Sequence, residues 1–302
     1  MKRITLVAGL ILCASISLSE EGAAFLKLGT GARAAAMGGA YTALGDDASA
    51  IDWNPAGLAR LEKREFNAAH AELHERTRLD FATYAHPTGR GTIAAALLYL
   101  SHGSFTGRDA AGRPTGSVTA SDAAITGAYA IKNEFADIGV GFKFITSHIA
   151  EAEARTTAVD LGLKRQVYEL KGGKVFTAAA VSNLNPNQGL KYSGGQSADL
   201  PLQLAAGAAW VHEKGSASFD LVNGPRGSGT DAAFGGEYKV LAGFAVRAGY
   251  ATAGVTGGSG IDAARGLSFG VGVDKDGLSV DYAIVPSGEL GAAHRFGLGY
   301  RF

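Results

Sequence analysis

The amino-acid sequence predicts an all-β protein, a transmembrane outer-membrane β-barrel of about 14 antiparallel strands with an N-terminal plug containing short helices. Three observations support this class. From residue 65 onward apolar residues alternate with small or charged ones, segments of about ten residues repeat to the last residue, and long and short connections alternate. Strands of about that length cross a bilayer when tilted, and closing them into a barrel satisfies every backbone group in lipid. A soluble β-sandwich also contains alternating strands, but it does not predict the order of the connections.

Residues 1–19 are expected to be a signal peptide and not part of the fold. A basic start at Lys2 and Arg3 precedes an apolar stretch at 4–16, which is too short to span a bilayer as a helix. The small residues of "SLS" at 17–19 suit a signal-peptidase site. The mature chain would then begin near Glu20.

Charge and cysteine content narrow the classes of function. The chain has 302 residues with 28 basic and 28 acidic side chains, and this neutrality argues against a nucleic-acid partner, which would need a basic face. Cys13 is the only cysteine, so a mature chain that begins near Glu20 has no disulfide and no thiol chemistry. A lipoprotein anchored at Cys13 is the second choice, because Leu12 stands where lipoprotein processing wants a small residue.

Residues 20–61 do not follow the period of two and are expected to form a plug, or hatch, inside the barrel. The side chains of the stretch "GARAAAMGGA" at 31–40 are small enough for its backbone to pack closely against the barrel wall. The large ring of Trp53 is expected to anchor the packing. A phosphate-binding loop is not expected, since neither a Gly-Lys-Ser/Thr element nor a dinucleotide fingerprint with its strand is present.

The end of this plug carries helix start and stop signals. Asp46 or Asp47 is predicted to cap a short helix in "GDDASAIDW", because an Asx oxygen can accept the free N–H groups of a first turn. The helix should end before Pro55, since a residue preceding proline avoids the α region. Asn54 would then cap a second turn that has Pro55 at its first position.

Residues 62–302 are expected to form the barrel, and the alternation is clearest at the C-terminus. There Phe296, Leu298, Tyr300 and Phe302 share one face, opposite arginines and glycines. The same pattern predicts strands at 65–72, 78–86, 91–103, 123–131, 137–149, 155–165, 174–182, 200–211, 215–223, 230–240, 242–252, 266–274, 277–285 and 292–302.

The connections between these segments provide an independent check. The long connections, 104–122, 183–199 and 253–265, follow the third, seventh and eleventh segments, whereas connections after even-numbered segments are mostly short. In an up-and-down barrel every odd connection lies at the same rim. The sequence therefore predicts long loops at one rim and tight turns at the other, the asymmetry of outer-membrane barrels.

A barrel of this size has a lumen wider than side chains alone can fill, so charged residues on the inner face are informative. Arg33 in the plug would need an anionic partner if buried, and either the adjacent acids of the plug or the acids of the wall could supply it; a solvated arginine in a wet lumen is the alternative. The charged residues expected to face the lumen are Lys143, Asp160, Glu237, Arg247, Asp281 and Arg295.

The stretch "GTGARAAAMGGAYTALGDDASAIDWNPAGLA" at 29–59 resembles the N-terminal signature of the PorV/PorQ family of outer-membrane proteins. That family is similar in turn to the FadL-type fatty-acid transporters, whose related pattern also ends in Asn-Pro-Ala-Gly, here Asn54 to Gly57. The resemblance implies a fourteen-stranded barrel with its N-terminal segment as a hatch in the lumen. It also implies the outer membrane of a Gram-negative-type bacterium, with Phe302 as the terminal assembly signal.

The resemblance implies two functions, both non-enzymatic. The first is an accessory or docking component of an envelope protein-export complex such as type IX secretion, with envelope proteins or a secreted cargo protein as partners. The alternative is a FadL-like channel for hydrophobic small molecules such as fatty acids, and the expected absence of long extracellular hairpins weakens it. A structural membrane anchor or assembly subunit is the third hypothesis.

No catalytic residues, metal site or cofactor are expected. Adjacent acids at a helix start usually act as caps, and a Ca²⁺ site would need more oxygens at set spacing. The seven histidines show no metal-ligand spacing and form no catalytic set. The candidate plug or gate residues are Gly31, Arg33, Met37, Gly38, Gly39, Asp46, Asp47, Trp53, Asn54 and Pro55.

Overall fold

The computed structural model describes residues 21–185, 189–193, 195–225, 229–252, 266–286 and 291–302. The predicted signal peptide and the predicted long connection at 253–265 lie outside these ranges. Across the described ranges no helix is both long and apolar enough to span a bilayer.

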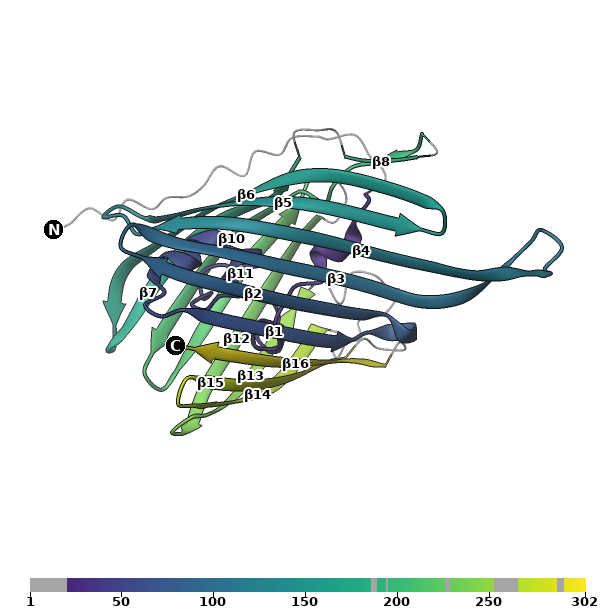
Figure 1. The fold of residues 1–302 in the computed structure, drawn as a ribbon. Helices are drawn as coiled ribbons and strands as arrows, with labels where there is room; N and C mark the ends of the chain where they lie inside the picture. Colours follow the sequence, from purple (N-terminus) through teal and green to yellow (C-terminus); the bar gives the residue numbers. More distant parts are fainter. Residues whose placement is uncertain (1–20, 186–188, 194, 226–228, 253–265, 287–290) are drawn as a thin grey trace.

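The strands of the described chain form one antiparallel sheet that closes on itself (Figure 1). Of its 16 strands, two short ones, β8 (Leu190–Tyr192) and β9 (Ser197–Ala198), extend from the edge of β6, which leaves fourteen in the ring. The ring strands are β1 (Glu65–Glu72), β2 (Arg78–Thr88), β3 (Gly91–Arg108), β4 (Pro114–Ile131), β5 (Asp137–Ile149), β6 (Ala152–Leu170), β7 (Gly173–Leu184), β10 (Gln203–His212), β11 (Gly215–Gly224), β12 (Gly229–Leu241), β13 (Phe244–Ala251), β14 (Leu267–Lys275), β15 (Leu278–Pro286) and β16 (Ala292–Arg301).

The first and last strands close the ring. β1 pairs with β16 over its whole length, from Glu65 opposite Arg301 to Glu72 opposite His294. Arg64 and Phe302 exchange two further backbone hydrogen bonds beyond these strands. The predicted fold class, a fourteen-stranded barrel, is confirmed.

The two rims differ as the connections predict. Within the described ranges the connections after even-numbered ring strands are short, at 89–90, 132–136, 171–172, 213–214, 242–243 and 276–277. We call this end the short-turn rim. The other end, which we call the long-loop rim, carries the β3–β4 hairpin and, between β7 and β10, the short strands β8 and β9.

The predicted loop at 104–122 is wrong, because most of it is strand. β3 continues to Arg108 and β4 begins at Pro114, and their pairing continues past a bulge between Ser101 and Ser104. The result is a hairpin, residues 102–119, that extends beyond the barrel (Figure 1). The expectation that long extracellular hairpins are absent is corrected with it. This stretch has no apolar alternation, since both of its faces are exposed, but β-branched residues such as Val118 favour strand.

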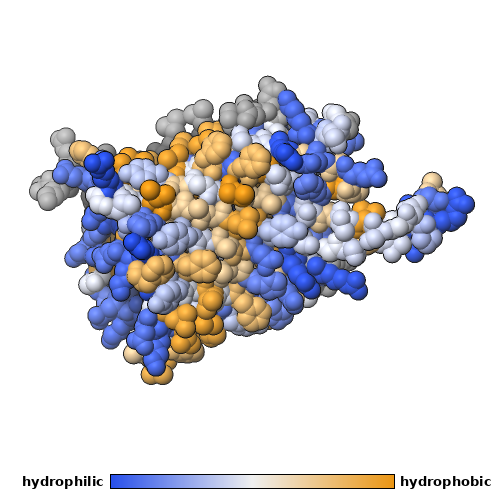
Figure 2. Space-filling view, in the orientation of Figure 1, coloured by the Kyte–Doolittle hydropathy of each residue, from blue (hydrophilic) through white to orange (hydrophobic). Residues whose placement is uncertain are grey.

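The outer face of the barrel is apolar over a broad band (Figure 2). Side chains such as Phe142, Leu163 and Phe296 are about half exposed on it, at 55%, 50% and 53%. Burial of the opposite residues alternates with this exposure along each strand, as in β5. A wall that presents large apolar groups outward and small or polar groups inward is the pattern of a barrel in lipid.

The N-terminal segment, residues 21–61, lies inside the ring (Figure 1). It contains η1 (Ala24–Lys27), α1 (Ala32–Ala36), α2 (Ala50–Trp53) and η2 (Pro55–Arg60), while a further short helix, η3 (His74–Arg76), joins β1 to β2. The segment starts near the long-loop rim, where Gly22 N donates to Asp199 O at 2.8 Å. It ends at the short-turn rim, where the chain enters β1.

Glycines of the wall admit the backbone of this segment. A Cβ added at Gly249 of β13 would lie 2.1 Å from Gly38 N, and one at Gly139 of β5 would lie 2.2 Å from the carbonyl carbon of Pro55. Contacts under 3 Å to backbone leave no room for a side chain. These glycines of the wall therefore allow close packing between wall and segment.

Candidate functional site

The N-terminal segment consists of two parts that contact different sides of the barrel. We call residues 29–44 the α1 half and residues 46–61 the α2 half. α1 contacts β13 to β16, and η2 contacts β3 to β6. The segment therefore bridges the lumen from one side of the wall to the other.

The wall holds the α1 half by polar side chains on strands β11, β14 and β16. Asp220 Oδ2 accepts from the backbone N–H groups of Tyr41 and Thr42 at 2.8 and 2.7 Å. Arg295 donates to Gly29 O at 2.7 Å, and Ser268 Oγ donates to Ala36 O at 3.1 Å. Because these are backbone contacts, they position the chain whatever its side chains are.

The α2 half is held through β5 and β6. Lys164 Nζ donates to Gly45 O at 2.6 Å just before this half begins, and Arg60 forms an ion pair with Asp137 at its end. Between them, Asn54 caps η2 by accepting from Ala56 N at 3.0 Å and donates to Leu163 O of β6 at 3.2 Å. The predicted roles of Asn54 as a cap and Pro55 at the first helical position are confirmed.

A buried ion cluster lies where the α2 half meets the wall. Lys143 Nζ lies 2.9 Å from Asp160 Oδ2 and 3.7 Å from Asp52 Oδ1, and it donates to Asn183 Oδ1 at 3.0 Å. Burial raises the pKa of the Asp52 carboxyl, and the attraction of Lys143 opposes that rise. The pairing satisfies charges that would be costly if isolated in the lumen.

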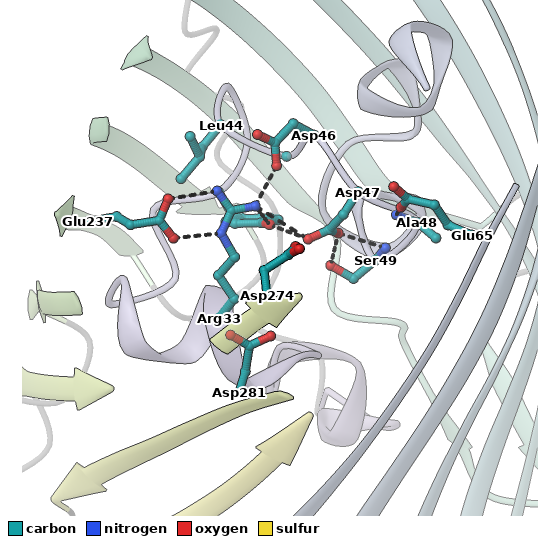
Figure 3. A network of polar contacts seen from close by, with 12 residues as sticks. Arg33, Leu44, Asp46, Asp47, Ala48, Ser49, Glu65, Glu237, Asp274 and Asp281 are labelled. Carbon is teal, nitrogen blue, oxygen red and sulfur yellow. Dashed lines mark hydrogen bonds and ion pairs between the residues drawn. The ribbon is translucent and has the colours of Figure 1, made fainter. Parts of the chain in front are cut away.

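Arg33 lies between Asp46 and Glu237 in a chain of alternating charges (Figure 3). Its Nε and Nη2 donate to the two carboxylate oxygens of Glu237 at 2.9 and 3.1 Å, and its Nη1 donates to Asp46 Oδ1 at 2.5 Å. Glu237 also accepts from Arg247 Nε at 2.6 Å, and Arg247 Nη1 donates to Asp281 Oδ1 at 2.5 Å. Burial opposes the charge of Arg33, but attraction by Asp46, Glu237 and other neighbours raises its pKa well above the usual value.

The two halves meet along a line of contacts that we call the seam. Besides the Arg33–Asp46 pair, Tyr41 Oη donates to Asp47 Oδ2 at 2.7 Å. Trp53 Nε1 donates to Thr30 O at 3.2 Å, and its ring packs edge-on to Tyr41 with centroids 6.0 Å apart. The seam is therefore made mainly of hydrogen bonds and charges, which separate at lower cost than a dry apolar interface if water enters.

A second seam contact involves Asn54. Its Nδ2 donates to Thr42 O of the α1 half at 3.0 Å. The side chain is 1% exposed, so both its cap and its contact across the seam are shielded from water. One residue thus links η2, the wall and the opposite half.

A polar cavity of about 440 Å³ lies at the short-turn end of the lumen. Arg33, Asp46 and Asp47 line it on the segment side. The charged residues that line it on the wall are Glu65, Glu237, Lys239, Arg247, Asp274, Asp281 and Arg301. This lining suits water and polar groups. Among all the residues that the structure describes, no group of three or more His, Cys, Asp or Glu is placed to hold a metal ion.

The opposite end of the lumen is apolar. Phe25 and Leu26 pack in one buried cluster with Leu79, Leu98 and Leu100 on the inner faces of β2 and β3. These wall residues lie on the long-loop side of their strands. Apolar packing on the β2 and β3 side therefore reaches the long-loop end of the lumen, while the polar cavity lies at the short-turn end.

The structure brings most of the predicted residues together. Arg33, Asp46, Asp47, Glu237, Arg247 and Asp281 form the charge chain, and Trp53 and Asn54 join the seam. Met37 and Gly38 press against β12 and β13, while Gly31 and Gly39 adopt positive φ angles beside Ser49 and Trp53. Lys143 and Asp160 form the separate cluster, and Arg295 binds backbone carbonyls.

The predicted helix cap at Asp46 or Asp47 is wrong. Ser49 occupies the N-cap position of α2 and makes no capping hydrogen bond. Asp46 instead pairs with Arg33, and Asp47 Oδ1 accepts from Ser49 N at 2.9 Å, which closes the turn before the helix. Asp46 thus forms an ion pair with Arg33, 13 residues away, and does not cap the helix.

Several residues of the site were not predicted. Tyr41, Asp52, Asn183 and Asp220 are all deeply buried or paired in the two clusters. For Asp220 a signal was present, since it alternates with Phe219 and Leu221 and so faces the lumen like the other charged residues. Asp52 and Tyr41 lie in the aperiodic segment and had no such signal.

Comparisons with known proteins agree with this architecture. Residues 18–162 match the model of an uncharacterised protein family, UPF0164. No curated protein matches the chain. Among solved structures, the Pseudomonas putida toluene transporter TodX has 13% identity and a TM-score of 0.62, with 94% of this chain and 98% of TodX covered. The Ralstonia pickettii toluene transporter TbuX has 14% identity and a TM-score of 0.60, with 91% and 98% covered.

These likenesses show the fold. The chain has the fold of these outer-membrane β-barrels, with short N-terminal helices. Because such barrels have short periplasmic turns and longer external loops, the short-turn rim faces the periplasm and the long-loop rim faces outward. The resemblance to the PorV/PorQ family stays a prediction.

Proposed function

We propose that this barrel is a gated channel for hydrophobic small molecules and that the N-terminal segment is its plug. One observation carries the proposal: apolar packing on the β2 and β3 side reaches the external end of the lumen, and a polar cavity lined by Arg33, Asp46 and Asp47 lies at the periplasmic end. The two similar structures with the same fold are toluene transporters, which supports a hydrophobic solute. The proposed function needs no catalytic residue, metal or cofactor.

The apolar end would receive the solute. The inner faces of β2 and β3 and the side chains of Phe25 and Leu26 offer a surface from which water is already excluded. Displacement of Phe25 and Leu26 would expose that surface to a ligand of similar size and polarity. Burial of apolar area contributes roughly 25 cal/mol per Å², so a small aromatic ring gains several kcal/mol there.

The seam would be the point of passage. If the α1 and α2 halves part between Arg33 and Asp46, the apolar end becomes continuous with the polar cavity at the periplasmic rim. Arg33 can remain with Glu237 on the wall while this happens, since separate nitrogen atoms serve the two acids. The solute would leave the apolar surface for a water-filled cavity and then the periplasm.

The experiment compares uptake of labelled toluene and oleate by cells that lack other channels for these compounds. Cells with the protein should take up at least one of them faster than cells without it. Asp46→Asn/Asp47→Asn, which weakens the seam but keeps the Arg33–Glu237 pair, should increase the rate further. Uptake equal to that of cells without the protein, in both the native chain and this variant, would refute the channel.

A docking role of the PorV/PorQ type is the second candidate. The β3–β4 hairpin favours it, because residues 102–119 extend past the rim, with Phe105 50% exposed, where a partner could reach them. Pull-down from detergent-solubilised envelopes should then recover stable envelope partners or cargo. Replacement of residues 102–119 by a tight turn should abolish the recovery without changing uptake. If neither uptake nor partners are found, a structural anchor remains.

A further inference from the structure

A hollow of about 400 Å³ lies on the lipid-facing side of β1, β2 and their neighbours. Its floor is made by Ala68 and Ala82, which are paired across the two strands and half-buried. Larger apolar side chains, all exposed to the bilayer, surround this floor: Leu97, Tyr99, Val280, Phe296 and Leu298. The shape is a short trough with two small residues at the bottom.

One end of the hollow is polar. His70 Nδ1 lies 2.7 Å from Asp80 Oδ1, and the two side chains are 41% and 53% exposed. They stand in register with apolar residues on either side, Asp80 opposite Tyr99 and His70 opposite Phe296. The two side chains satisfy each other by pairing, and because both stay about half exposed they also offer polar atoms to a group that lies over the hollow.

The direction of the hollow follows from the topology. β1 runs from the short-turn rim at Glu65 to the long-loop rim at Glu72, so His70 lies on the external side of Ala68. The polar end therefore faces the outer surface of the membrane, and the apolar floor lies toward its middle. That arrangement matches an amphiphile in the outer leaflet, with its head outward and its chain inward.

We propose that this hollow binds one lipid of the outer leaflet. An acyl chain lies over Ala68 and Ala82, and the headgroup forms hydrogen bonds with the His70–Asp80 pair. The occupant is a membrane lipid and not a transported solute, because the hollow faces the bilayer and the wall behind it is complete. Every residue of β1 pairs with both β16 and β2.

Native mass spectrometry of the purified barrel, titrated with phosphatidylethanolamine, tests the site. The native chain should retain one lipid at low lipid concentration. Ala68→Leu/Ala82→Leu fills the floor and should weaken that binding about tenfold, which corresponds to about 1.4 kcal/mol. His70→Ala should weaken it as well, through loss of the headgroup contact.

Ala248→Leu is the control, since Ala248 is also a small residue on the outer face, in β13, but lies exposed outside the hollow. It should bind lipid like the native chain, and all variants should keep heat-modifiable migration on gels. Equal binding by the native chain and the Ala68→Leu/Ala82→Leu variant would overturn the proposal. A mass of two chains that this variant abolishes would overturn it too, because it would assign the hollow to a second copy. Uptake of toluene or oleate is measured separately, so the channel and the lipid site can fail independently.

Discussion

Arg33 connects three parts of the molecule through one side chain. It contacts Tyr41 in its own half, Asp46 across the seam and Glu237 on the wall. A planar guanidinium has five N–H groups fixed in a fork, so it can serve two carboxylates at once. An ammonium group is a point charge and cannot reproduce that geometry.

Arg33→Lys should therefore loosen the seam while preserving the charge. We expect faster solute uptake and faster proteolysis of the N-terminal segment, with a loss of about 2 kcal/mol in docking of the segment, the rough value of a hydrogen bond to a charged group. Arg113→Lys makes the same chemical change on the exposed hairpin and is the control. Equal rates of proteolysis in the two variants would show that the guanidinium geometry of Arg33 is not needed to hold the segment.

Asn54 combines two functions that substitutions can separate. Asn54→Ala removes both the cap of η2 and the contacts to Thr42 O and Leu163 O, whereas Asn54→Ser keeps a capping oxygen but loses the amide donor. Loss of the cap alone costs about 1 kcal/mol. Thermal unfolding should rank native, Ser and Ala in decreasing stability; Ser as destabilising as Ala would assign the effect to the amide contacts with Thr42 and Leu163 and not to the cap.

The charge partners illustrate how far single residues could be predicted. The sequence indicates that Arg33 needs an acid and offers five candidates, of which Asp46, Asp47 and Glu237 are its partners. Asp160 and Asp281 pair with Lys143 and Arg247 instead. The alternation of residues along a strand indicates which side chains face the lumen. It does not indicate how far along the barrel axis each side chain lies or which side chain of another strand it contacts.

At the scale of elements, the contact between wall and segment depends on glycine. Gly249→Val would place a side chain against the backbone of Gly38, where neither chain can move far. Overpacking of this kind costs about 1–3 kcal/mol. We expect a folded barrel whose segment is easily cleaved by protease.

Gly127→Val is the control for this prediction, because a Cβ at Gly127 of β4 has nothing within 4 Å. It adds the same side chain to an outward position. Cleavage of the segment at the native rate in both variants would show that the close contact at Gly249 is not needed to hold it.

Strands were predictable where one face meets lipid and the other the lumen, because that contrast produces the period of two. β1 and β5 have the predicted bounds for this reason. The hairpin beyond Ser101 has water on both faces, so its sequence carries no alternation and predicts a loop. The segment's helices are four to six residues long and held by tertiary contacts, which sequence periodicity does not report.

At the scale of the whole molecule, the closed ring predicts the behaviour of an outer-membrane barrel. Circular dichroism of detergent-extracted protein should be dominated by β structure, since every ring strand is paired on both sides. Unheated and boiled samples should migrate differently on gels. A helical spectrum would contradict the fold.

The position of the N-terminal segment also sets a condition on how the molecule is made. The segment runs the length of the lumen from Gly22, which is tied to the long-loop rim, to Glu65 at the short-turn rim. The strand that follows it, β1, is the one that must meet β16 to complete the wall. The segment must therefore take its place in the lumen either before β1 and β16 pair or afterwards, through a rim of the finished ring.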